Sequence, residues 1–306
     1  MKMESVAKFL YTRDHDGFAK LTQETWQNRW FPSQIPLTLD SSQVDQLSVT
    51  DKDFYKFLFT FLGMAESLVN FNIEELIKYF SCHDVTHYYT EQSAMECIHG
   101  KVYANILNMF FDSVADLYTY GEKIISDPSL CRKLDWLRNR IKNAKSRAES
   151  VLIFLMIEGI FFVSSFYSIG LLRVRGLLNG VCLANDYISR DELLHTRAAA
   201  LLYNTMVATS EKPDVAWIHT LFKEAVEIEY DFVASKGEGV TALNLHDIKS
   251  FLQATCDRIL KSIDLDPIFH TPSPSACPLV YTGCFKNVNF FERENTEYTS
   301  SVVNDL

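Results

Sequence analysis

The chain has 306 residues, of which 47% are hydrophobic and 22% are charged, a composition typical of a globular protein with one large core or two small ones. The formal net charge of −10 argues against a nucleic-acid-binding protein, because such a surface needs a basic patch. The chain has seven Cys, an odd number, and none of them forms a C-x-x-C pair. We therefore expect reduced thiols and a cytoplasmic location.

Residues 1–40 contain aromatic patches together with Pro32 and Pro36, and they predict loop and short helix. Beyond them, apolar residues recur at helical spacing through most of the chain. This periodicity predicts helices over 51–80, 84–122, 131–145, 151–172, 185–208, 213–236 and 245–263. The sequence DPSL at 127–130 marks a break between two of them. The pattern therefore indicates an all-α protein.

The end of the chain differs from its middle. Residues 266–278 carry four Pro, which end the helical body. The polar sequence that follows lacks periodicity and predicts a flexible tail. We therefore divide the chain into an N-terminal segment at 1–40, a helical domain at 41–265 and an extended C-terminal tail at 266–306.

Residues 151–172, VLIFLMIEGIFFVSSFYSIGLL, form a long apolar stretch with a single charged residue, Glu158. About 20 apolar residues can span a bilayer, so a membrane helix is one interpretation. The stretch is solitary, however, and a charge near the centre of a bilayer costs roughly 2.5–3.5 kcal/mol. We therefore expect the central helix of a soluble bundle and no membrane partner.

Two segments, MECIH and DELLH, place a His three residues after a Glu: Glu96 and His99 in the first, Glu192 and His195 in the second. Positions i and i+3 share one face of a helix, so each pair offers an oxygen and a nitrogen to one cation. A single pair of this kind is more often a surface ion pair than a metal site. The motif therefore needs support from elsewhere in the chain.

Asp84 and His87 have the same spacing and must be judged separately. If the helix is regular, Glu96, His99 and Tyr103 point within roughly 60° of one another, whereas Asp84 and His87 fall about 120–180° away. We expect these two residues to face elsewhere, in a polar contact or at a helix start.

Two further carboxylates, Glu66 and Glu158, stand on other apolar helices. An unpaired carboxylate in a core is costly, so it normally pairs or binds a cation. No Lys or Arg lies within one or two turns of Glu158, whereas Glu66 could also be a salt-bridge partner or sit at a helix edge. With the two Glu-x-x-His pairs, they match the ferritin-like di-iron or di-manganese bundle. The predicted metal ligands are Glu66, Glu96, His99, Glu158, Glu192 and His195, an oxygen-rich set that favours Fe or Mn over Zn or Cu.

Three aromatic residues are expected near these ligands. Tyr103 follows His99 by one turn on the same face, and Phe162 and Phe166 follow Glu158 at i+4 and i+8. Each is also a common core residue. Together they predict a dry apolar pocket beside the tyrosine and the metals, which would protect an oxidised species from water.

The segments MECIHGKVY, IEGIFFVSSFYSIGLL and YISRDELLH resemble the signature segments of the small subunit of class I ribonucleotide reductase. The resemblance runs from about Trp26 to the end, and the HYYTEQ segment and terminal VVNDL are most similar to the herpesvirus-encoded, gammaherpesvirus-type subunit. It implies a ferritin-like fold, an O2-activated centre of two Fe ions per chain with Mn as the alternative metal, and a tyrosyl radical on Tyr103. The large subunit would use this radical to reduce ribonucleoside diphosphates to deoxyribonucleotides.

The resemblance also implies three residues for radical transfer. Asp191 would hydrogen-bond His99, Trp30 would continue the chain toward the surface, and Tyr298 in the tail would pass the radical to the large subunit. Apart from the resemblance, these are a capping acid, a packed indole and a solvated tail residue. One departure is Glu66, because many members of the family have Asp there, and the longer side chain of Glu can change how its carboxylate coordinates a metal.

The partners implied are the large subunit, docked by the tail residues SSVVNDL, and a second copy in a homodimer in the host-cell cytoplasm. Two other functions remain open. A different di-iron enzyme, such as a ferroxidase or an oxygenase, would share the ligands without needing Tyr103. A non-catalytic helical interaction protein would need neither the tyrosine nor the metals, and the presence of all six predicted ligands argues against it.

Overall fold

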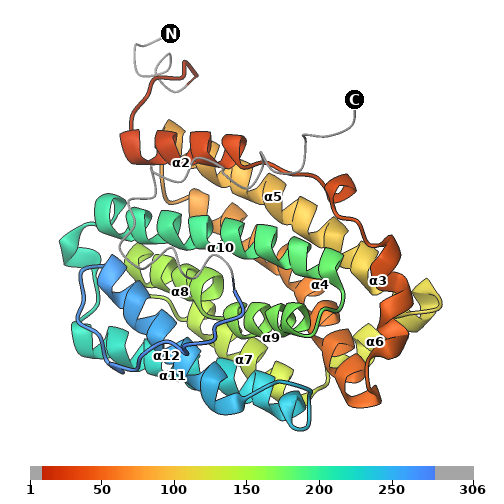
Figure 1. Cartoon of the computed structure of the whole chain (residues 1–306). Helices are drawn as coiled ribbons and strands as arrows, with labels where there is room; N and C mark the ends of the chain where they lie inside the picture. Colours follow the sequence, from red (N-terminus) through yellow and green to blue (C-terminus); the bar gives the residue numbers. More distant parts are fainter. Residues whose placement is uncertain (1–8, 280–306) are drawn as a thin grey trace.

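The computed structural model describes residues 9–279, and every regular element in that range is helical, which confirms the all-α prediction (Figure 1). The α-helices are α2 (Asp16–Gln27), α3 (Thr38–Gln43), α4 (Val49–Ile77), α5 (His83–Leu107), α6 (Val114–Ile124), α7 (Pro128–Lys142), α8 (Arg147–Gly159), α9 (Val163–Val174), α10 (Asn179–Met206), α11 (Val215–Gly237) and α12 (Leu245–Ser262). Short 3-10 turns lie at Pro32–Gln34, Val44–Gln46 and Thr209–Glu211.

Four helices form the centre of the bundle. Helix α4 packs along α5, and α8 packs along α10, while α5 also contacts α10 and α4 contacts α8 (Figure 1). The outer helices cover this centre, with α2 across α5 and α10 and with α12 against α8, α9 and α10. The inner faces of the four central helices therefore meet in the interior of the protein.

Polar side chains fix where several helices begin. The Ser48 hydroxyl accepts the backbone N–H of Asp51 at 3.1 Å at the start of α4. Asp127 does the same for α7, where Pro128 occupies the first helical position. The predicted break between two helices is confirmed, but it lies at residues 125–127, and the remaining residues of DPSL begin α7.

A third helix start, that of α10, depends on a distant segment. The Asp40 carboxylate accepts the backbone N–H groups of Gly180 and Val181 at 3.2 and 2.7 Å. A Cβ at Gly180 would come within 2.4 Å of the carbonyl oxygen of Pro36, so only glycine allows this approach. The segment before α4 thus holds the start of the helix that carries DELLH.

Two predicted helices are wrong in extent. The helix expected over 84–122 ends at Leu107, and α6 begins after Ser113, whose hydroxyl accepts the backbone N–H of Asp116. The helix expected over 151–172 is interrupted between Gly159 and Val163. Apolar periodicity runs through both breaks, because it reports which face is buried and not whether the backbone hydrogen bonds continue.

The apolar stretch lies in the interior. The segment Arg147–Val174, which contains α8 and α9, is long and apolar enough to cross a membrane by length and composition. Its most apolar window is 94% buried against the rest of the protein. A core helix of a soluble protein passes the same test, and the burial fits the predicted central position.

Residues on both sides of the central helices also pack on the bundle. Within 1–40, α2 buries Phe18 completely. After α12, the Asp257 carboxylate accepts the backbone N–H groups of residues 268–270 at 2.6–3.0 Å. Farther on, Leu279 is buried. The Pro-rich segment ends the helical body, as predicted, but up to residue 279 it remains attached to it.

Candidate metal centre

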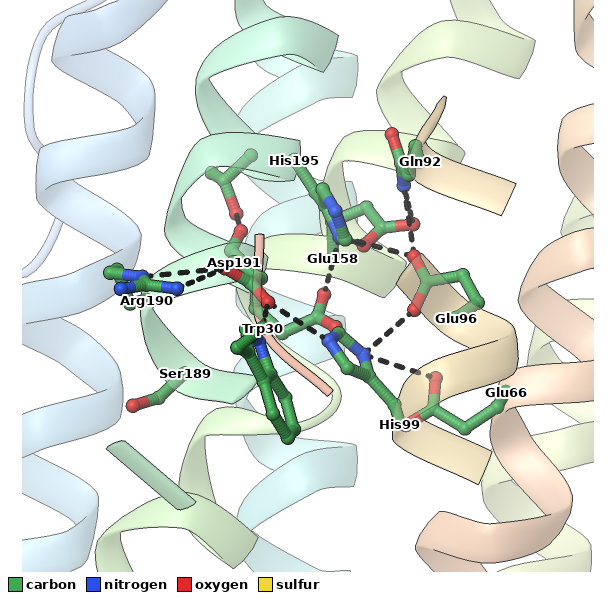
Figure 2. A network of polar contacts seen from close by, with 12 residues as sticks. Trp30, Glu66, Gln92, Glu96, His99, Glu158, Ser189, Arg190, Asp191 and His195 are labelled. Atoms are coloured by element: carbon green, nitrogen blue, oxygen red, sulfur yellow. Dashed lines mark hydrogen bonds and ion pairs between the residues drawn. The ribbon is translucent and has the colours of Figure 1, made fainter. Parts of the chain in front are cut away.

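The six predicted ligands converge in the interior from four helices: Glu66 from α4, Glu96 and His99 from α5, Glu158 from α8, and Glu192 and His195 from α10. Figure 2 labels all of them except Glu192. They fall into two groups of four whose ligand atoms lie within 4.8 Å of one another. One group is Glu66, Glu96, His99 and Glu192, and the other is Glu96, Glu158, Glu192 and His195. Each group holds three carboxylates and one imidazole, and Glu96 and Glu192 belong to both.

His99 directs its Nδ1 atom into the first group. This atom lies 3.0 Å from Glu96 Oε2, 3.3 Å from Glu192 Oε1 and 3.8 Å from Glu66 Oε2. Glu66, whose position left a helix-edge interpretation open, is buried here, with 6% of its surface exposed. The extra methylene relative to Asp does not prevent its carboxylate from reaching the cluster.

His195 occupies the equivalent position in the second group. Its Nδ1 lies 3.1 Å from Glu96 Oε1, 3.2 Å from Glu192 Oε2 and 3.6 Å from Glu158 Oε2. Among residues 9–279, ion pairs of Glu158 are made with this imidazole and not with Lys or Arg. The burial of Glu158 in an apolar helix is therefore explained by the cluster.

The electrostatics of the cluster favour added positive charge. Burial raises the pKa of Glu66 and Glu158 well above the usual carboxyl range, and for Glu158 the charge of Glu192 raises it further. Burial acts in the same direction on Glu96, but the two imidazoles outweigh it and hold its pKa low. Burial lowers the pKa of the two imidazoles, but the neighbouring carboxylates raise it by more, so the pKa of both His99 and His195 is above the usual range. Protons thus neutralise a site that carries a large excess of acidic groups.

The donor set fits a pair of divalent ions. Among the described residues, Glu158 Oε2 is buried and has no hydrogen-bond partner. The contact of His99 Nδ1 with Glu96 Oε2, at 3.0 Å, is an ion-pair distance without hydrogen-bond geometry. Buried polar atoms without a hydrogen bond are rare in native proteins, and a bound cation would satisfy these three. Three carboxylates and one imidazole in each group suit Fe or Mn, and two shared carboxylates suit two neighbouring ions.

Gln92 is a residue of the site that the sequence analysis missed. It lies on α5 one turn before Glu96 and is fully buried. Its Nε2 donates to Glu96 Oε1 at 3.3 Å and to Glu158 Oε1 at 3.2 Å, which ties carboxylates from two helices together (Figure 2). The available signal was the i,i+4 spacing to Glu96, but that spacing does not distinguish an amide that supports a metal site from an ordinary helical amide.

A polar chain leads from the cluster to Trp30. His99 Nε2 lies 3.2 Å from Asp191 Oδ2, and the same oxygen accepts the Trp30 Nε1–H at 2.7 Å. The rings of Trp30 and His99 are stacked with centroids 6.0 Å apart, and Trp30 is 3% exposed. Figure 2 shows Asp191 between the imidazole and the indole. The second oxygen of Asp191 accepts from Arg190, which fixes the carboxylate further.

Tyr103 lies on α5 one turn beyond His99 and is buried, with 2% of its surface exposed. Its hydroxyl has no hydrogen-bond partner among residues 9–279. Burial raises its pKa well above the usual phenol range, and the charge of Glu66 raises it further. Tyr103 is therefore a neutral phenol at physiological pH, in a water-poor site close enough to the carboxylates to sense their charge.

The break between α8 and α9 changes the expected positions of Phe162 and Phe166. Counted along one regular helix they would follow Glu158 at i+4 and i+8, but Phe162 lies in the break and caps α9. Both are buried, their ring centroids are 6.3 Å apart, and Phe162 also faces the ring of Phe61 on α4. An apolar lining is present, while its role beside Tyr103 remains a prediction.

Asp84 and His87 lie away from the cluster, as predicted. Asp84 is in the first turn of α5, where its carboxylate accepts the Tyr11 hydroxyl at 2.9 Å and the backbone N–H of His15 at 2.7 Å. The ring of His87 stacks on Tyr11. Tyr298, the predicted tail residue for radical transfer, is outside the described residues.

Comparisons with known proteins agree with this geometry. A family model described as ribonucleotide reductase, small chain, matches residues 7–278. The ribonucleoside-diphosphate reductase small subunit of human herpesvirus 8 type P (isolate GK18) is 64% identical over 305 residues, which cover 99% of this chain and 100% of the relative. The predicted resemblance to the gammaherpesvirus form is thereby confirmed.

Solved structures support the fold. Streptococcus sanguinis dimanganese(II)-NrdF has a TM-score of 0.75 and 19% identity, and covers 86% of this chain and 95% of its own. A ribonucleotide reductase homodimer from Saccharomyces cerevisiae has a TM-score of 0.77 and 20% identity, and covers 90% and 88%. At these identities the likeness concerns the ferritin-like fold alone. The family match and the herpesvirus relative decide the assignment: the chain belongs to the small-chain family of ribonucleotide reductases.

Proposed function

We propose that this chain is the radical-generating subunit of ribonucleoside-diphosphate reductase and that its cluster binds two iron ions. Glu66 and His99 would belong to one ion, Glu158 and His195 to the other, and the remaining two carboxylates to both. The observation that carries the proposal is the overlap of two buried four-residue groups through Glu96 and Glu192. When bound, the ions would activate O2 and supply the oxidising equivalent.

Tyr103 is the residue that would be oxidised. It would lose one electron and its phenolic proton, leaving a neutral tyrosyl radical. Burial supports this role, because it excludes water and keeps the phenol protonated beforehand. The surrounding apolar side chains, including Phe162 and Phe166, would shield the radical from reductants.

Radical transfer would use the chain from His99 through Asp191 to Trp30. A carboxylate that accepts from both rings fixes their orientation and the tautomer of the imidazole. From Trp30, the radical would pass by way of Tyr298 in the tail to the large subunit, which reduces the ribonucleoside diphosphate.

The proposal is tested by adding Fe(II) and O2 to the metal-free protein and measuring metal content, visible absorption and EPR on one preparation. Two ions per chain and a tyrosyl signal are expected. Parallel loading with Mn(II) distinguishes the metals, since the Streptococcus sanguinis neighbour is described as dimanganese(II). Iron oxidation without any radical would favour a ferroxidase, and less than one ion per chain would favour a non-catalytic protein.

Replacing Trp30 with Phe is expected to leave radical formation intact and to reduce nucleotide reduction to near background. Phe keeps an aromatic ring but removes the Nε1–H that donates to Asp191, at a cost of about 1–3 kcal/mol in stability. EPR of the activated subunit and turnover with the large subunit measure the two effects. Trp26→Phe, at an exposed position four residues earlier, is the matched control and should behave like wild type. Undiminished turnover in Trp30→Phe would exclude this transfer route.

Deleting residues 300–306, outside the described range, is expected to leave the metals and the radical unchanged and to abolish nucleotide reduction. A short tail with a few apolar anchors and a terminal carboxylate is a known mode of peptide capture. Pull-down of the large subunit and turnover assays measure the loss. A tail with the same residues in scrambled order should fail as well, and normal turnover after the deletion would refute docking by this segment.

We also propose that the chain acts as a homodimer in the host-cell cytoplasm. The homodimeric state described for the Saccharomyces cerevisiae neighbour supports the first part. The odd number of cysteines, which we interpret as reduced thiols, supports the cytoplasmic location. Analytical ultracentrifugation of the purified chain would measure the oligomeric state directly.

A further inference from the structure

A buried ion pair lies outside the proposed metal centre. Lys133 of α7 is 1% exposed and Glu229 of α11 is fully buried, and Lys133 Nζ donates to Glu229 Oε2 at 2.6 Å. The ammonium also lies 4.2 Å from the ring centroids of Phe61 and Phe232. Nothing in the proposed reaction uses these two charges, although burying them is costly.

The Lys133–Glu229 pair forms hydrogen bonds to both sides of the break between α8 and α9. Lys133 Nζ donates a second hydrogen bond, at 2.6 Å, to the carbonyl oxygen of Phe161, which lies inside the break. On the other side, the Ser164 hydroxyl in the first turn of α9 donates to Glu229. Both ends of the interruption are therefore tied to one ion pair.

The break begins one residue after Glu158. Helix α8 ends at Gly159, and the N–H groups of Ile160 and Phe161 both donate to the carbonyl of Met156, at 2.9 and 3.2 Å. The bond from Phe161 spans five residues, as in a π-type turn. Glu158 thus stands in a last helical turn whose geometry depends on how the following residues are held.

We propose that Lys133, Glu229 and Ser164 form a clamp that positions Glu158 for metal binding. A continuous helix through residues 159–163 would leave the carbonyl of Phe161 and the carboxylate of Glu229 without their present partners. The clamp favours the interrupted backbone over that alternative. It thereby fixes the direction from which the Glu158 carboxylate approaches Glu96, Glu192 and His195. Metal ligands must be held within fractions of an ångström, so a shifted last turn would weaken the site.

The nature of the pair supports a positioning role over simple stabilisation. Burial raises the pKa of Glu229 to about 6 despite the charge of Lys133, and it lowers the pKa of Lys133. Both shifts mean that burial disfavours the charged forms of Lys133 and Glu229. Buried ion pairs can often be replaced by apolar residues of similar volume without loss of stability, and sometimes with a gain. A pair kept solely for stability would therefore be replaceable by apolar side chains.

The inference rests on the proposed two-ion site, and the double variant Lys133→Met/Glu229→Met tests it. Met has a volume similar to both residues, so the bundle should fold with a melting temperature near that of wild type. The Phe161 carbonyl loses its donor, and affinity for the second of two Mn(II) ions should fall by about 10-fold or more. Anaerobic titration with Mn(II) alone, followed by calorimetry and by EPR of free Mn(II), measures this without enzyme turnover.

Controls keep the outcomes distinct. Asp51→Leu/Arg175→Met removes another buried acid and its Arg partner, at the far end of α4, and should leave both affinities unchanged. Wild-type affinities in a stably folded clamp variant would overturn the inference.

If the double variant does not fold, Ser164→Ala provides the test, because it keeps both charges and should still lower the affinity for the second Mn(II) ion measurably. An unchanged affinity in Ser164→Ala refutes the clamp. Failure of wild type to bind two ions would instead refute the proposed function.

Discussion

Replacing Tyr103 with Phe is expected to abolish nucleotide reduction while the protein still folds and binds both metal ions. The phenol oxygen is the only atom removed, and without it no stable radical can form at this position. Because this hydroxyl has no hydrogen-bond partner among the described residues, its loss should change the free energy of unfolding by less than about 1 kcal/mol. EPR and visible absorption after Fe(II) and O2, with metal analysis of the same sample, measure the effect.

Tyr88 provides a matched control for Tyr103. It lies on the same helix, is fully buried, and its hydroxyl also has no partner among residues 9–279. Its phenol also senses the charges of Glu158 and Glu96, which raise its pKa together with burial. Tyr88→Phe should therefore keep the radical and full turnover. The assignment to Tyr103 fails if Tyr103→Phe retains activity or if Tyr88→Phe alone abolishes the radical.

The second large effect is expected at the shared carboxylates. Glu96→Ala should lose both ions, whereas Glu158→Ala should lose one, because Glu96 belongs to both four-residue groups and Glu158 to one. Glu96 also lies within 3.1 Å of both imidazole Nδ1 atoms, so its removal leaves two His without their nearest acid. Metal analysis after equilibrium dialysis gives the number of ions bound by each variant.

Glu75→Ala, at an exposed position on α4, is the control for nonspecific loss of charge and should bind both ions. Equal loss in Glu96→Ala and Glu158→Ala would mean that the ions bind as one cooperative unit, contrary to the expected difference. Full loading of Glu158→Ala would remove Glu158 from the ligand set altogether.

The local chemistry of the site could be predicted from the sequence because it depends on short-range geometry. A Glu and a His three residues apart share a helix face whatever the rest of the fold does, so MECIH and DELLH were recognisable as paired donors. Glu158 was recognisable for a different reason: a lone acid in an apolar helix needs a counter-charge. The same helical geometry predicts that Asp84 and His87 face away from the cluster, and the structure places Asp84 in the first turn of α5 and His87 against Tyr11.

Radical transfer required more than residue spacing. Trp30 and Asp191 are 161 residues apart in the chain, and no local pattern connects an indole with a distant acid. Only resemblance to the family singled them out, and the hydrogen bond between them became visible in the fold. The position of Gln92 in the site could not be predicted from its own helix, because it depends on a hydrogen bond to Glu158 from another helix.

A helical bundle with two Glu-x-x-His pairs and two acids on apolar helices could be predicted from the amino-acid pattern alone. Helical periodicity and the cost of burying charge are properties of single segments. The sharing of two carboxylates between the two groups, and the end of α8 one residue after Glu158, became apparent in the folded protein. An interrupted helix loses backbone hydrogen bonds. Here Lys133, 28 residues before Phe161, donates to the Phe161 carbonyl, and Glu229, 65 residues after Ser164, accepts the Ser164 hydroxyl. Contacts of that kind follow from the packing of whole helices and leave no mark on local periodicity.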